Sequence, residues 1–207
     1  MMISETKSQH INVSSLICHR DMSMALICLG SLLEYSQEPI HLILHDDGSL
    51  QEEDIAVLRE VLRSPTIIQK QEADEQMAEV LSKYPAAFQF RQNDVLAKKL
   101  LDCVHFNDSE VFAYCDTDIL FFRPFNGLFA FPSSMVNALM MFDLTSSYCM
   151  RSWQMIQYPL LQVPQNPNSG LLYYRRSCYD LDFIEWFLSR KIFAAFPILP
   201  NRPHGLC

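Results

Sequence analysis

The sequence predicts one α/β domain with a mostly parallel central sheet flanked by helices. Short apolar runs that suit buried strands alternate along the chain with longer segments whose apolar residues repeat at helical spacing. The length of 207 residues allows one full domain with a large core and is too short for two comfortable ones.

The first part of the chain alternates between strands and helices. Residues 12–18, 40–45 and 66–68 are predicted strands. Residues 22–35 and 51–63 are predicted helices, the first with Asp21 or Ser23 as its N-cap and the second with Ile55, Leu58 and Leu62 on one face. Turn residues follow the second strand, which supports its boundary.

The second part of the chain has a weaker pattern. Residues 72–83 and 94–102 are predicted helices, and residues 111–115 form a compact apolar strand. Residues 125–164 are rich in Met, aromatic residues and Pro, and we expect a loop with one or two short elements there. Residues 180–191 are predicted to form an amphipathic helix with Phe183, Trp186 and Phe187 on one face.

Polar residues follow three of the predicted strands. They are His19-Arg20-Asp21, Asp46-Asp47 and Asp116-Thr117-Asp118. In an open parallel sheet, ligands bind beyond the carboxyl ends of the strands. The sequence therefore predicts a single crevice that carries several carboxylates.

Asp116 and Asp118 follow a buried strand and are separated by one residue. Two neighbouring carboxylates repel each other, and burial would favour their protonation. A hard divalent cation such as Mn²⁺ or Mg²⁺ resolves this, because it takes oxygen ligands and keeps sites for phosphate oxygens. The alternative is that Asp116 caps a turn and Asp118 is solvated.

Two segments resemble known glycosyltransferase motifs. Residues 111–122, Val-Phe-Ala-Tyr-Cys-Asp-Thr-Asp-Ile-Leu-Phe-Phe, resemble the DxD segment of glycosyltransferases with the GT-A fold. Residues 168–173, Asn-Ser-Gly-Leu-Leu-Tyr, resemble the element that follows it in several of those families, including the family-8-like retaining enzymes. The resemblance covers about residues 12–176 and implies a Rossmann-like GT-A nucleotide-diphospho-sugar transferase fold. It places a nucleotide-sugar-binding half at 12–124 and part of the acceptor and sugar side at 125–195 of a single domain, 1–207.

The resemblance also implies roles for individual residues. Asp116 and Asp118 would be metal ligands. The residues expected around the nucleotide sugar are Cys18, His19, Arg20, Asp46, Lys98 and Thr117. Asn168 and Ser169 would contact the sugar or the acceptor, whereas no catalytic nucleophile or base can be assigned.

Most of these residues have a simpler explanation as well. His19 and Arg20 could begin a helix, Asp46 is a favoured turn residue, and Lys98 could be an exposed helix residue. Asn168 could be a turn residue after a proline. His41 and His45 alternate on a strand as a metal pair would, and a surface-facing strand explains them equally well.

The resemblance implies a glycosyltransferase that uses Mn²⁺ or Mg²⁺, a UDP- or GDP-type sugar donor, and a glycan, lipid or small-molecule acceptor.

A nucleic-acid partner is not expected, because the net charge is −8 and no cluster of Lys and Arg occurs. The seven cysteines include no CxxC pair, so neither a zinc ribbon nor a thioredoxin-type site is indicated, and most lie among apolar neighbours, which suits reduced, buried thiols in a cytoplasmic protein. The polar N-terminus contains no signal peptide, and the longest apolar run, residues 24–33, is about half a membrane span. We therefore expect no transmembrane segment, while peripheral membrane contact stays open.

The last residues, 196–207, follow neither a helical nor a strand pattern. Enzymes of the resembling type continue with a further carboxylate-containing element and often a late His. A shifted reading frame from Pro197 could encode such a helix, which would make residues 196–207, including His204, an out-of-frame tail.

A catalytically incomplete GT-A binding module or truncated gene product is therefore an alternative function. A haloacid-dehalogenase-type phosphatase is a weaker one, because its motif requires Thr or Val where Leu120 stands and lies near the N-terminus.

Overall fold

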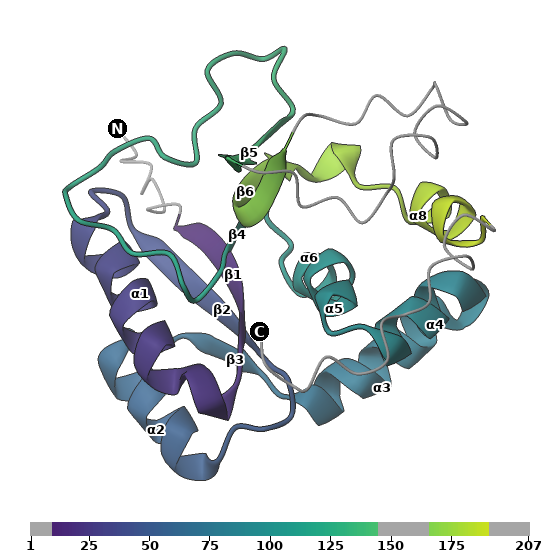
Figure 1. The fold of residues 1–207 in the computed structure, drawn as a ribbon, viewed down its shortest axis with the longest axis horizontal. Coiled ribbons are helices and arrows are strands. Elements are labelled where there is room, and N and C mark those ends of the chain that lie inside the picture. The colour runs from purple at the N-terminus through teal and green to yellow at the C-terminus, as the bar shows by residue number, and fades with distance from the viewer. Residues whose placement is uncertain (1–9, 145–165, 191–207) are drawn as a thin grey trace, which may run out of the picture.

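The computed structural model describes residues 10–144 and 166–190. Six strands form one sheet in the order β3-β2-β1-β4-β6-β5 (Figure 1). The strands are β1 (Ile11–Ile17), β2 (Ile40–Asp46), β3 (Thr66–Ile68), β4 (Val111–Cys115), β5 (Ala138–Phe142) and β6 (Pro167–Arg175). β3, β2, β1 and β4 are parallel, whereas β6 and β5 are antiparallel to their neighbours. The predicted α/β fold with a mostly parallel sheet is confirmed.

Helices cover the sheet on both sides (Figure 1). The longer ones are α1 (Met22–Tyr35), α2 (Glu52–Val61), α3 (Lys70–Val80), α4 (Pro85–Asn93) and α8 (Leu181–Leu188). The shorter ones are η1 (His19–Asp21), η2 (Leu81–Lys83), α5 (Leu96–Leu100), α6 (Asp102–His105) and η3 (Arg176–Cys178). α1 and α2 lie on one side of the parallel strands, and α3 to α6 lie on the other.

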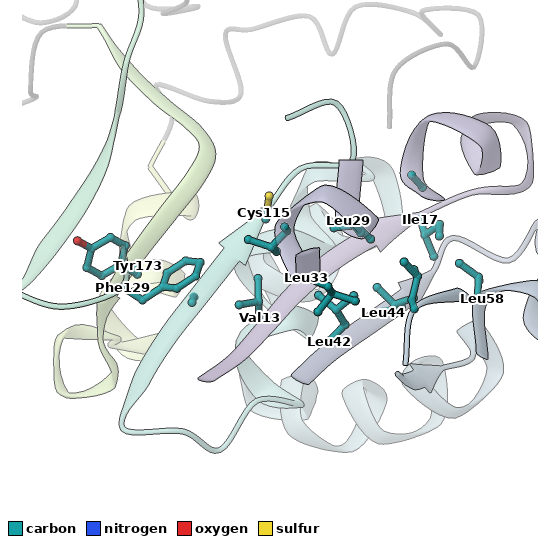
Figure 2. Close-up of a cluster of buried hydrophobic side chains, with 14 residues drawn as sticks. Val13, Ile17, Leu29, Leu33, Leu42, Leu44, Leu58, Cys115, Phe129 and Tyr173 are labelled. Carbon is teal, nitrogen blue, oxygen red and sulfur yellow. The ribbon is translucent and has the colours of Figure 1, made fainter. Parts of the chain in front are cut away.

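The largest core lies between the parallel strands and the helices α1 and α2 (Figure 2). Val13, Leu44, Leu29 and Leu58 are each completely buried there. Asp21 is the N-cap position of α1, without a side-chain cap bond. A reciprocal capping box of Gln51 and Asp54 begins α2. Apolar patterning and local caps therefore place the carboxyl ends of β1 and β2.

The region between β3 and β4 differs from the prediction. The predicted helix at 94–102 is two short helices, α5 and α6, with a break at Leu101. α4 was not predicted, and it begins with Pro85 at its first turn. Arg91 of α4 makes a buried bidentate pair with Asp102, from Nε to Oδ1 at 2.8 Å and from Nη2 to Oδ2 at 2.7 Å. This pair fixes α4 against the helices that approach the end of β4.

The strand β5 lies inside the segment predicted as a loop with short elements. Its pairing with β6 is irregular, because Met140 pairs with Leu172 while the next residue, Met141, pairs with Asn168. The residues of β6 between these two partners, 169–171, bulge out of the β5 ladder. Bulges of this kind re-aim side chains near binding sites, and this one lies beside the end of β4.

The predicted amphipathic helix at 180–191 is α8, and its aromatic face is partly exposed. Phe183 and Trp186 share one face, with ring centroids 5.5 Å apart, and are 51% and 45% exposed. The opposite residues, Leu181, Ile184 and Leu188, pack against the cluster formed by α3, α4 and α5. The smaller aliphatic residues therefore anchor the helix.

Two further features concern the described residues only. Cys18, Cys28, Cys103 and Cys115 are buried thiols that form no disulfide within the described residues, and Cys178 is an exposed one. None of the helices between residues 10 and 190 that the structure describes has the length and apolar character to cross a membrane. The proposed out-of-frame tail, including His204, lies outside the described residues.

Candidate functional site

The polar ends of β1, β2 and β4 lie at one edge of the sheet. Ile17 pairs with Asp46 in the β1–β2 ladder, and β4 lies on the other side of β1. The amide of Asp47 donates to the carbonyl of Ile17 at 3.1 Å, and the hydroxyl of Ser15 donates to the carbonyl of Cys115 at 2.7 Å. The three predicted clusters of polar residues therefore share one edge.

The loop after β1 is tied to the loop after β2. The amide of His19 donates to Ser49 Oγ at 2.9 Å, and the imidazole Nδ1 of His19 lies 2.6 Å from Asp54 Oδ2. Hydrogen bonds, above all from the backbone of Gln51, hold the pKa of Asp54 below its usual range. His19 is half exposed at the edge of the site, with one ring nitrogen engaged.

Arg20, Asp21 and Cys18 form a second group of contacts in the same loop. Arg20 donates to both carboxylate oxygens of Asp21, at 2.9 and 2.7 Å, and the Cys18 thiol donates to Asp21 at 3.3 Å. The Arg20 bond is the main cause of the lowered pKa of Asp21. The guanidinium of Arg20 is thereby held at the rim of the site.

Asp46 shapes the loop after β2. Its Oδ1 accepts the amides of Gly48 at 2.8 Å and Leu50 at 3.2 Å. Beside it opens a cavity of about 570 Å³, which the first residues of α3 also line. His19 and Asp116 do not line this cavity. The described residues therefore give a shared edge with a local cavity beside Asp46, and the single crevice stays a prediction.

The carboxylate of Asp116 meets a buried ammonium group at the end of β4. Lys99 Nζ donates to both oxygens of Asp116, at 3.1 and 3.2 Å, and to Ser169 Oγ at 3.1 Å. The same nitrogen lies 4.0 Å from the centroid of the Tyr114 ring, a favourable cation–π distance. Burial lowers the pKa of Lys99, and the nearby Asp116 opposes that shift.

The other two residues of the motif lie in different surroundings. Thr117 is buried, with 4% of its surface exposed, whereas Asp118 is exposed. Asp116 lies between these extremes, with 30% of its side chain exposed. The Asp116 carboxylate also raises the pKa of the buried Tyr114 hydroxyl, although burial is the larger cause.

Gly170 allows β6 to approach Asp116 closely. The amide of Asp116 donates to the carbonyl of Gly170 at 2.6 Å. A Cβ at Gly170 would lie 2.9 Å from Asn168 Oδ1, 3.1 Å from Ile119 Cδ1 and 3.2 Å from Asp116 Oδ2. Only glycine fits this position without displacing its neighbours.

Asn168 is engaged in contacts that shape the bulge. Its Oδ1 accepts the amide of Gly170 at 2.6 Å, and its Nδ2 donates to Asp143 Oδ1 at 2.9 Å. The neighbouring Ser169 is exposed and carries the hydroxyl that meets Lys99. The structure therefore places Ser169 beside Asp116 and uses Asn168 to hold the strand that presents it.

Lys98 and Lys99 lie in different places, although they are adjacent in α5. Lys98 Nζ lies 3.4 Å from the carbonyl oxygen of Asp47, at the loop after β2. Lys99 belongs to the same basic pair in the sequence, which alone did not single it out over Lys98, and it reaches Asp116. The apolar pattern of α5 does not indicate that Lys99 is buried, because Leu96 and Leu100 are exposed while Ala97 and Lys99 are buried.

The surface-facing interpretation of the strand histidines is wrong for His45. Its side chain is 2% exposed and packs edge-on against Phe106, with ring centroids 5.8 Å apart. Neither ring nitrogen has a hydrogen-bond partner among residues 10–144 and 166–190, and burial lowers the pKa of His45 to about 3. His45 is therefore a neutral core residue, whereas His41 is partly exposed and bonds Thr66.

The carboxylates after β4 suit a hard divalent cation. Asp118 is exposed and Asp116 is partly exposed, so both offer oxygen ligands of the kind that Mn²⁺ and Mg²⁺ prefer. Within residues 10–144 and 166–190, no three side chains of His, Cys, Asp or Glu are grouped closely enough to hold a metal. Phosphate oxygens of a ligand or water molecules would complete the coordination.

Comparison of the fold with solved structures finds glycosyltransferases. The galactosyltransferase LgtC, solved in complex with donor and acceptor sugar analogs, is 12% identical over 90% of this chain, with a TM-score of 0.56. Core-mannan synthase A from Aspergillus fumigatus, in its Mn/GDP form, is 11% identical over 89%, with a TM-score of 0.52. The apo form of the glycosyltransferase GlyE of Streptococcus pneumoniae is 11% identical over 86%, with a TM-score of 0.50. The chain shares the GT-A glycosyltransferase fold.

The shared fold covers only part of these enzymes. This chain spans 66% of the length of LgtC and of core-mannan synthase A, and 37% of the length of GlyE. No protein-family model matches the sequence, and no curated protein matches it.

Proposed function

We propose that this chain binds a nucleoside-diphosphate sugar and acts as a glycosyltransferase. The observation that carries the proposal is the meeting of Asp116, Lys99 and Ser169 at the end of β4, within a GT-A fold. The Asp116 carboxylate, for a divalent ion, and the Lys99 ammonium group, for a diphosphate, lie side by side there. The nucleotide-sugar-binding half would comprise residues 12–124, with the acceptor and sugar side in residues 125–195.

In this proposal, Asp118 and Asp116 hold Mn²⁺ or Mg²⁺, and Lys99 faces the diphosphate. When bound, the ion supplies positive charge that stabilises the departing nucleoside diphosphate. Thr117, Cys18, His19, Arg20, Asp46 and Lys98 surround the nucleotide, and Ser169 lies on the sugar side. Asn168 acts through the backbone of Gly170, because its amide group already bonds Gly170 and Asp143.

The proposed reaction exchanges one bond for another. The bond between the anomeric carbon and the β-phosphate oxygen breaks, and its electron pair stays on the phosphate. An acceptor hydroxyl oxygen forms the new glycosidic bond and loses its proton. The products are a glycoside, a nucleoside diphosphate and one proton. Mn²⁺ with UDP or GDP is the expected pair of ligands, and core-mannan synthase A, solved in its Mn/GDP form, supports that expectation.

Calorimetry with UDP and GDP, each with and without Mn²⁺, tests the proposal. Loss of a partner behind the metal ligands costs 10–100-fold in metal affinity, so Asp118→Ala should weaken Mn²⁺-dependent binding by about 100-fold or more while the fold is retained. Asp108→Ala is the matched control, since Asp108 is also exposed but precedes β4 at its opposite end. Equal binding by Asp118→Ala and the control would reject the assignment.

A further inference from the structure

The ammonium group of Lys99 is held more firmly than a surface lysine. Its side chain is 10% exposed, and its nitrogen contacts both oxygens of Asp116, the hydroxyl of Ser169 and the face of Tyr114. These contacts come from β4 and β6, while Lys99 comes from α5. The ammonium has therefore exchanged most of its water for fixed partners.

The contact between Lys99 and Asp116 reduces the negative charge that is available to a metal ion. The positive charge of Lys99 already compensates the Asp116 carboxylate at hydrogen-bond distance. Two positive charges that share one carboxylate repel each other, and they do so more strongly in a partly buried site than in water. Asp118, by contrast, is exposed beside this pair. A divalent cation that approaches Asp118 alone meets a carboxylate pair that has been partly neutralised.

A bound diphosphate would offset the repulsion between Lys99 and the cation. Its oxygens bring negative charge to the same place, so that Lys99 and the cation no longer depend on Asp116 alone. We propose that Lys99 is an internal counter-ion of Asp116 that keeps divalent-cation binding weak until a nucleoside diphosphate is present. This inference rests on the proposed function, and it adds a coupling between binding of the metal and binding of the donor.

The neighbouring Lys98 provides a control for this coupling. It carries the same charge on the same helix, but its nitrogen lies at the Asp47 carbonyl instead of at Asp116. A general change in net charge would act through either lysine. A counter-ion of Asp116 acts through Lys99 alone.

Electron paramagnetic resonance of free Mn²⁺ measures the coupling directly on the full chain. The titration uses MnCl₂ alone for the wild type, Lys99→Met and Lys98→Met, and MnCl₂ with UDP or GDP for the wild type and Lys99→Met. Without nucleotide, Lys99→Met should bind Mn²⁺ about tenfold more tightly than the wild type, while Lys98→Met changes the affinity less than about twofold. The increase in Mn²⁺ affinity caused by the nucleotide should be large in the wild type and small in Lys99→Met.

A second variant separates the charge from the fold. Lys99→Gln is neutral but keeps a polar side chain with a hydrogen-bond donor, and it should repeat the tighter Mn²⁺ binding. Thermal unfolding checks that each variant is folded. Equal Mn²⁺ affinities without nucleotide for the wild type, Lys99→Gln and Lys98→Met would overturn the counter-ion role. This holds even if nucleotide-dependent Mn²⁺ binding persists. A wild type that binds no Mn²⁺ with either nucleotide would overturn the proposed function itself.

Discussion

The parallel and antiparallel parts of the sheet differ in how they bury their side chains. β1 and β2 each have five consecutive buried residues, whereas β5 has none and β6 has two among nine. α8 also has no buried residue, while α1 has six. Strands covered on both faces are typical of parallel α/β sheets, and antiparallel strands can leave one face open.

The candidate site lies where these two parts meet. Asp116 follows a strand of the buried part, and Lys99 belongs to α5, which packs on that part. Ser169 and Gly170 come from the more exposed β6. Because the two parts differ in burial, we infer that the core fixes the carboxylates. The groups around the carboxylates depend instead on a few close contacts between the parallel strands and β6.

Substitution of a phenylalanine in each part should give the largest contrast. Phe112 of β4 is 1% exposed and packs against Tyr174, whereas Phe142 of β5 is 66% exposed. Phe112→Ala should lower the free energy of unfolding by about 3–5 kcal/mol through lost burial and a cavity. Phe142→Ala should change it by about 0.5 kcal/mol or less. Urea denaturation measures both, and similar losses would mean that β5 is as well packed as β4.

Substitution of a glycine in each part should give a smaller contrast of opposite sign. Gly170→Ala places a Cβ against Asn168, Ile119 and Asp116, and should destabilise the protein by about 1–3 kcal/mol. Gly30 lies inside α1, where a Cβ would meet nothing within 4 Å. Gly30→Ala should therefore stabilise the protein by about 0.5–1 kcal/mol.

The same two variants also distinguish the site from the fold. Gly170→Ala should weaken Mn²⁺-dependent nucleotide binding, because it displaces the Asp116 carboxylate, whereas Gly30→Ala should leave that binding as it is. Unfolding curves and calorimetry on both variants provide the measurement. A stable Gly170→Ala protein with full nucleotide binding would show that the close approach of β6 has no role in the site.

The parallel part of the fold could be predicted from the sequence because its information is local. Apolar runs of strand length, such as residues 40–45, and the capping box of Gln51 and Asp54 specify their elements without distant contacts. β5 could not be predicted in the same way. Its sequence, Ala-Leu-Met-Met-Phe, has no alternation and no β-branched residue, so its strand conformation depends on pairing with β6.

The site was predictable only at the level of the strand ends. Asp116 and Asp118 follow from a buried strand that runs into two carboxylates, and the fold then brings residues 19–21 and 46–47 to the same edge. The choice between Lys98 and Lys99 was not predictable. Adjacent positions on a helix point about 100° apart, and α5 has only five residues, too few for its apolar pattern to fix its orientation. The tertiary contacts of Tyr114 and Ser169 decide it.

The smallest change in stability is expected for a substitution of Asp54, which contacts the loops after β1 and β2. Asp54 accepts hydrogen bonds from Gln51 and lies beside His19, and its pKa is lowered, chiefly by the Gln51 backbone. A lowered folded pKa means that ionised Asp54 stabilises the fold above its unfolded pKa, about 3.9, and that this stability is lost as the pH falls through the folded value. Asp54→Asn should therefore cost less than about 1 kcal/mol at pH 7, because its partner His19 is half exposed and solvent screens their interaction. The difference from the wild type should shrink towards zero below about pH 4, as measured by urea denaturation at several pH values. A difference that is constant from pH 7 to pH 3 would show that the shape of the capping box, and not its charge, holds these loops together.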